Sequence, residues 1–178
     1  MRPSEPENQA TAAREIALAG AFCALGVVVP ILFHMVGMGR FFLPMHLPVL
    51  LAGLLLGPRI AWAVGLAVPW LSSALTGMPP MPTPILMSAE LVALAEIASA
   101  LVGCGVPVWL ASVGAIGGRC AVTWLTTLAL APYLGLPAHA AGWASIVSGA
   151  PGIVLQIVVA PTVALGVLRG RRPPAPSE

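Results

Sequence analysis

The side chains with the capacity to bind a solute gather in a few places of an otherwise apolar chain. Glu90 lies inside an apolar run, where a carboxylate is costly unless it is paired or faces water. His46 follows a short polar segment that carries Arg40. These three groups suit a small ligand with a carboxylate, an amine or a ring nitrogen, although an ion pair between Glu90 and Arg40 is the alternative. Further candidate pocket residues at the same end of the predicted helices are His34, Ser73, Met78, Tyr133 and Trp143.

Two more charged residues, Glu96 and Arg119, interrupt apolar segments. They are predicted at similar depth on adjacent antiparallel helices. We therefore expect them to pair and to hold the two helices together. The long side chain of Arg119 would also allow its guanidinium to reach toward the pocket.

Patterns for metal binding or catalysis are missing from the sequence. The three histidines lie on three separate segments, and the three cysteines, Cys23, Cys104 and Cys120, share no ligand spacing. The sequence contains no H-E-x-x-H, G-x-S-x-G, P-loop or dinucleotide fingerprint. We expect a protein that is not an enzyme and has no cofactor and no metal, so that ATP hydrolysis, if it is needed, comes from a partner.

Composition places these residues in a membrane protein. Of the 178 residues, 58% are hydrophobic and only 8% are charged, against about a quarter in a soluble domain. A single water-soluble core could not bury so much apolar surface. The net charge of +2 arises mainly from the C-terminal tail and predicts no nucleic-acid partner.

The hydropathy pattern predicts an all-α integral membrane protein with six transmembrane helices in one bundle. A solvated leader is expected over residues 1–11 and a basic, proline-rich tail over 169–178. Arg14, Arg59 and the cluster at 169–172 then fall on one side, which places both termini in the cytoplasm. Two helices are shorter than a full span, and Pro48 is expected to bend or break the first of them. The predicted helices of the membrane domain cover 12–33, 43–56, 60–75, 85–102, 108–131 and 143–168.

Small residues recur on one face of the first predicted helix. They follow a spacing of three and four residues, with Gly20 beside them, and such a stripe allows close approach of another helix. The stripe is either packed inside the bundle or docks another membrane protein. Its residues are Ala13, Ala17, Ala21 and Ala24.

Four of these features together resemble the substrate-binding S components of energy-coupling factor (ECF) transporters, the vitamin importers of bacteria. The first is the pattern of six predicted spans with cytoplasmic termini in a chain of 178 residues. The others are the alanines Ala17-x-x-x-Ala21, the segment F-L-P-M-H-L-P-V-L-L-A-G-L-L-L-G-P at 42–58, and L-T-G-M-P-P-M-P at 75–82. The resemblance covers residues 12–168, including the six spans and cytoplasmic termini.

The resemblance implies a bacterial plasma-membrane protein that captures a vitamin or vitamin precursor from outside, under a lid formed by the first outer loop. It implies docking through the first helix on a transmembrane coupling protein that carries two ABC ATPases, followed by toppling in the bilayer to release the ligand inside. The sequence has no motif for one vitamin, and pantothenate, pyridoxine-like and pyrimidine-like ligands stay open. Whether the ATPase module is shared or dedicated stays open as well.

Three other classes of protein remain as alternatives. A stand-alone channel or carrier predicts polar residues that continue to the inner face. A membrane enzyme using Glu90 or His46 as acid or base predicts a second carboxylate or a nucleophile beside them. A structural assembly subunit would leave the outward polar residues without a role.

Overall fold

The computed structural model describes residues 5–37, 42–130, 133, 147 and 149–170. These residues form six α-helices and contain no β-strand. Their order along the chain is α1 Glu5–Met35, α3 His46–Leu55, α4 Pro58–Thr76, α5 Thr83–Gly103, α6 Val108–Leu130 and α9 Ala150–Gly170. The expectation of an all-helical chain is confirmed for the described residues.

Four of the helices are long and apolar enough to cross a membrane: Gln9–Met35 within α1, together with α5, α6 and α9. The helix α4 has 19 residues but is not among these four. The helix α3 has only 10 residues and is about 15 Å long at 1.5 Å per residue. That is about half of the hydrocarbon thickness of a bilayer.

The observed ends differ from the predicted ones where local signals are weak. The helix α1 begins at Glu5, seven residues before the predicted start at 12. The helix α3 begins at His46, so Pro48 lies in its first turn. The predicted bend at Pro48 is therefore wrong, because a first-turn residue has no intrahelical acceptor for its N–H and proline loses nothing there.

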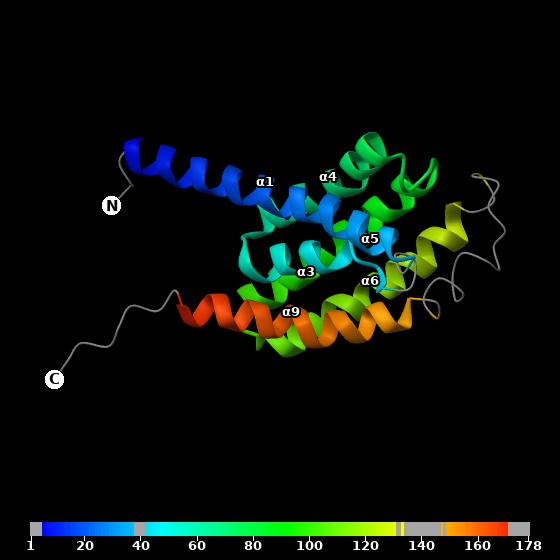
Figure 1. The fold of residues 1–178 in the computed structure, drawn as a ribbon. Coiled ribbons are helices and arrows are strands. Elements are labelled where there is room, and N and C mark those ends of the chain that lie inside the picture. Colours follow the sequence, from blue (N-terminus) through cyan, green and yellow to red (C-terminus); the bar gives the residue numbers. More distant parts are fainter. Residues whose placement is uncertain (1–4, 38–41, 131–132, 134–146, 148, 171–178) are drawn as a thin grey trace.

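The short helix α3 lies at the centre of the bundle. It contacts each of the other five described helices, α1, α4, α5, α6 and α9. In Figure 1, α3 lies between α1 on one side and α9 on the other, with α4, α5 and α6 behind. Seven of its ten residues are buried, so protein surrounds it in place of lipid.

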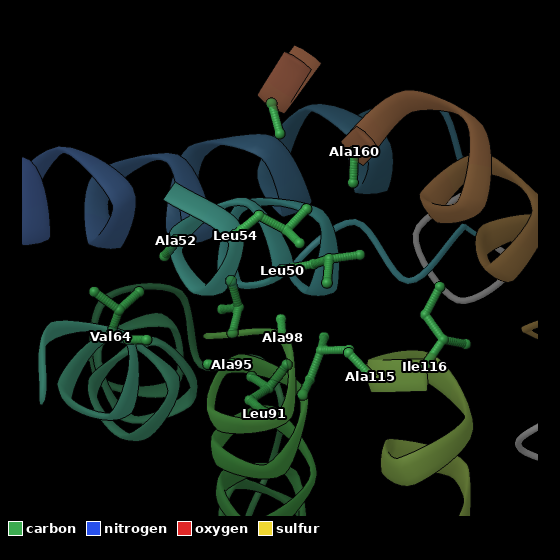
Figure 2. Packing of buried hydrophobic residues seen from close by; sticks show 14 of the residues in the cluster. Leu50, Ala52, Leu54, Val64, Leu91, Ala95, Ala98, Ala115, Ile116 and Ala160 are labelled. Atoms are coloured by element: carbon green, nitrogen blue, oxygen red, sulfur yellow. The ribbon is translucent and has the colours of Figure 1, made fainter. Parts of the chain in front are cut away.

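The core is built where α3 meets α5. Leu50 and Leu54 of α3 belong to one buried cluster with Leu91 and Ala98 of α5 (Figure 2). Gly53 makes this crossing close, because a Cβ at Gly53 would lie 2.6 Å from the Ala95 carbonyl oxygen. The absence of a side chain thus brings the two backbones together.

The helices α5 and α6 form an antiparallel hairpin. Gly118 approaches the side chain of Ile97, and Gly114 approaches Leu101. These two contacts fix the register between the helices. They place Arg119 of α6 at about the level of Glu96 of α5.

Candidate functional site

Three buried polar side chains and one partly buried carboxylate reach the interior of the bundle from four different helices. We call His46 of α3, Glu90 of α5, Arg119 of α6 and Gln156 of α9 the interior polar cluster. His46, Arg119 and Gln156 are 1%, 2% and 0% exposed, and the Glu90 side chain is 14% exposed. Buried polar groups in an apolar bundle are costly unless something satisfies them, so each needs an explanation.

His46 and Glu90 form the outer pair of the cluster. Nε2 of His46 lies 3.8 Å from Oε2 of Glu90, which is longer than a hydrogen bond. Neither ring nitrogen of His46 has a hydrogen-bond partner within the described part of the chain. The sequence analysis named both residues, and the fold brings them together from different helices.

The position of His46 depends on an unusual turn. Leu43 adopts φ +47°, a left-handed conformation that bulky side chains rarely adopt. Its carbonyl accepts a hydrogen bond of 3.0 Å from the His46 backbone N–H. Phe42 at the start of this turn lies against Phe33 of α1, with ring centroids 5.6 Å apart. The turn thus fixes the start of α3 against α1.

Arg119 belongs to the cluster rather than to a pair with Glu96. In the described part of the chain the only close contact between a basic and an acidic side chain joins His46 and Glu90, so the predicted Glu96–Arg119 pair is wrong. Ile97 and Leu101 face α6, whereas Glu96 lies about 100° around α5 from Ile97. It shares the face of Val92, which packs against Gly65 of α4.

The guanidinium of Arg119 lacks an anionic partner among the described residues. Its Nε and Nη1 atoms are buried without a hydrogen bond. Nη2 has only the Cys120 sulfur, at 4.0 Å, and a thiol is a weak acceptor. The positive charge of Arg119 acts on the His46 imidazole, so the guanidinium lies within electrostatic range of the outer pair.

Gln156 is the member of the cluster that sequence reasoning did not select. Its side-chain nitrogen and oxygen are both buried without a partner in the described part of the chain. It lies on the buried face of α9, which packs against α3 and α6. A usable signal was present, since Gln156 is the one amide side chain within the apolar α9 segment.

Backbone contacts place Gln156 near the level of His46. Gly152 of α9 packs directly against the Phe42 backbone, and a Cβ there would collide with it. Gln156 and His46 each follow four residues after these two contact residues. The close approach of α9 at Gly152 therefore holds the buried face that carries Gln156 against α3 and α6.

Two of the other predicted pocket residues, Ser73 and His34, use their side chains in hydrogen bonds to backbone carbonyls. Ser73 donates a hydrogen bond of 2.9 Å to the Pro79 carbonyl, and Ser72 donates one of 2.8 Å to Met78. These bonds fix the segment after α4 onto that helix. His34 donates from Nδ1 to the Pro30 carbonyl at 2.8 Å, within its own helix.

The remaining predicted residues divide between exposed positions and undescribed ones. Met78 and Tyr133 have exposed side chains. Arg40 and Trp143 lie outside the described residues. The stripe on α1 is uncovered by the rest of the bundle at Ala13, Ala17, Ala21 and Ala24.

The side chains of the interior polar cluster are of types that can recognise a small polar solute. Among the described residues no group of three or more His, Cys, Asp or Glu side chains could hold a metal ion. The interior polar cluster instead offers a guanidinium, an amide, an imidazole and a carboxylate around one interior region. Such a set binds a small polar molecule through hydrogen bonds and charge.

Comparison of the chain with protein-family models, with curated proteins and with solved structures finds no match.

Proposed function

We propose that this chain is a multi-pass membrane protein that captures a small polar solute in the interior polar cluster. The observation that carries the proposal is the set of buried donors and acceptors without partners on His46, Arg119 and Gln156. Each unsatisfied group costs free energy when it is withdrawn from water. A bound solute that pairs with these groups would offset that cost, which explains why four helices converge on the site.

The membrane topology that we propose has six passes and both termini in the cytoplasm. Four helices of sufficient length and hydropathy support it. The described beginning of α1 and the end of α9 lie toward the same end of the molecule in Figure 1. Arg14, Arg59 and Arg169 would then flank the spans on the cytoplasmic side. The short α3 would cross within the protein rather than against lipid.

Within this topology we propose the role of an S component of an ECF-type importer in the bacterial plasma membrane. The solute would be a vitamin or vitamin precursor taken from outside. A transmembrane coupling protein with two ABC ATPases would supply the energy. The motifs at 42–58 and 75–82 support this role, and the uncovered alanine stripe on α1 supports docking through that helix.

A stand-alone channel or carrier is the second candidate, because polar side chains do reach the middle of the bundle. The residues that follow His46 along α3 speak against a continuous polar path. Val49, Leu50, Ala52 and Leu54 are buried and apolar. A membrane enzyme would use His46 and Glu90 as an acid–base pair, but no nucleophile accompanies them among the described residues of the cluster.

Native mass spectrometry of the full chain, purified in detergent from cells grown in rich medium, tests the capture function. We expect an adduct of vitamin size on the wild-type protein. Glu90→Gln should remove most of the adduct, because it deletes a charge of the cluster. The matched control Glu96→Gln changes the other carboxylate of α5 and should retain it. A folded wild-type protein without any adduct, also after incubation with a vitamin panel, would refute capture.

A further inference from the structure

The two charged groups of the interior polar cluster lie on different sides of it. The outer side holds a carboxylate beside an imidazole, Glu90 and His46. The inner side holds a buried guanidinium, Arg119, that makes no ion pair with any described residue. An arginine is always charged at neutral pH, and a buried charge without a counter-charge is strongly unfavourable. The inner side therefore calls for an anion from outside the described residues.

Gln156 defines which anion fits. Its amide can donate two hydrogen bonds, and it has made neither within the described part of the chain. A guanidinium presents parallel N–H groups that match the two oxygens of a carboxylate. The edge of a guanidinium that meets both carboxylate oxygens side-on is formed by Nε and Nη2. On Arg119 the Nε atom has no partner, and Nη2 has only the weak thiol contact with Cys120.

We infer that Arg119 and Gln156 bind the carboxylate of a small organic acid, and that the His46–Glu90 pair binds a hydrogen-bond donor elsewhere on the same molecule. This inference rests on the proposed capture function and names its substrate class. An anion on Arg119 and a donor on Glu90 satisfy both charges of the cluster. A neutral solute would leave the guanidinium without a counter-charge.

The register of the helices gives the solute an orientation. The backbone of Arg119 lies at the level of Glu96. Glu96 is six residues, or roughly 9 Å, from Glu90 along α5. The guanidinium spans part of this separation, since its charge acts on His46. The carboxylate of the solute therefore points toward the middle of the bundle, and its donor group points toward the start of α3.

Matched pairs of probes test the inference on the full chain in detergent. The pairs are nicotinate and nicotinamide, pantothenate and panthenol, and 3-aminopropanoate and its amide. Each pair differs in the presence of the carboxylate. We expect at least one acid to raise the midpoint of thermal unfolding by about 5–10 °C at roughly one hundred times its Kd. Its neutral partner should shift the midpoint by much less.

Variants then assign the carboxylate to its site. Arg119→Gln should abolish the shift caused by the acid, and Gln156→Leu should weaken it. Glu96→Gln, outside the cluster, should leave the shift unchanged. Arg119→Met should raise the unfolding midpoint of the chain without any probe, which a structural arginine would not do. If Arg119→Gln does not fold, Arg119→Lys takes its place, and the loss of the two-pronged contact should still weaken binding.

The outcomes separate this inference from the capture function. Three results would overturn the inference that the cluster binds a carboxylate. They are equal shifts by an acid and its neutral partner, an unchanged shift in the folded Arg119 variant, and no shift with any acid. A bound molecule whose mass identifies it as lacking a carboxylate would overturn the inference too, while capture would stand. Capture itself falls if the folded wild-type protein carries no adduct in native mass spectrometry, also after incubation with the vitamin panel.

Discussion

The helices α3 and α1 are both rich in apolar residues, yet they lie in opposite environments. The ten residues of α3 are enclosed by five other helices. The helix α1 has 31 residues and packs mainly against α3 and α4, and most of its side chains over residues 9–35 are exposed. Hydropathy alone does not distinguish a helix buried in protein from one that faces lipid, because lipid is as apolar as a protein core.

The difference shows which helices are held by close backbone contacts. The close backbone approaches of Gly53 and Gly65 join α3 and α4 to α5, and His46 of the polar cluster begins α3. On α1 a Cβ at Gly20 would meet nothing within 4 Å. The N-terminal half of α1 also extends away from the other helices in Figure 1. We expect stability to depend on α3 and docking to depend on α1.

Shortening a leucine should give the largest difference between the two helices. Leu50→Ala in α3 should lower the free energy of unfolding by about 2–5 kcal/mol, because Leu50 is fully buried and its loss leaves a cavity. Leu32→Ala on the exposed face of α1 should change it by about 0.5 kcal/mol or less. Thermal unfolding in detergent measures both, and similar losses would break the comparison.

Adding one methyl group should give the next largest difference. Gly53→Ala should cost about 1–3 kcal/mol, because the new Cβ meets the Ala95 carbonyl, which cannot move without α5. Gly20→Ala on α1 should instead be neutral or stabilise by up to about 1 kcal/mol, since alanine favours the helix. A neutral Gly53→Ala would mean that the two backbones are further apart than the structure places them.

Adding a methyl group in the packed half of α1 should have an intermediate effect on the free energy of unfolding. Gly26→Ala would bring a Cβ to 2.7 Å from a methyl of Val68 in α4. A side-chain methyl yields more easily than a backbone carbonyl, so we expect a loss of about 1 kcal/mol, at the low end for overpacking. A loss larger than that of Gly53→Ala in the same unfolding assay would reverse the proposed order of constraint.

The alanine stripe should give the smallest effect on stability and the largest on assembly. The double variant Ala17→Trp with Ala21→Trp should keep the unfolding midpoint and the binding of solute, because both alanines are exposed. It should abolish co-purification with a membrane coupling module, because bulky side chains prevent close helix approach. Leu32→Ala serves as the control on the same helix. If the double variant still co-purified with the coupling module, the proposed docking role of the stripe would be wrong.

Part of the candidate site was predictable from the sequence, and part was not. His46 and Glu90 stood out because each interrupts or borders an apolar segment, and the structure places them 3.8 Å apart. The pairing of Glu96 with Arg119 was wrong because similar depth does not fix the direction in which a side chain leaves its helix. Ser73 looked equally polar, but its hydroxyl holds the Pro79 carbonyl.

The sequence by itself determined the helical class of the chain and the ranges of its helices to within a few residues at most ends, since apolar runs broken by Gly and Pro specify both locally. Only the tertiary structure decided that the shortest described helix is the central one, that His46 meets Glu90, and that Arg119 and Gln156 are buried without partners among the described residues. Those facts depend on which faces meet and on the register set by close approaches such as Gly53 on Ala95 and Gly152 on Phe42. Such contacts join residues far apart in the chain, and no local pattern encodes them.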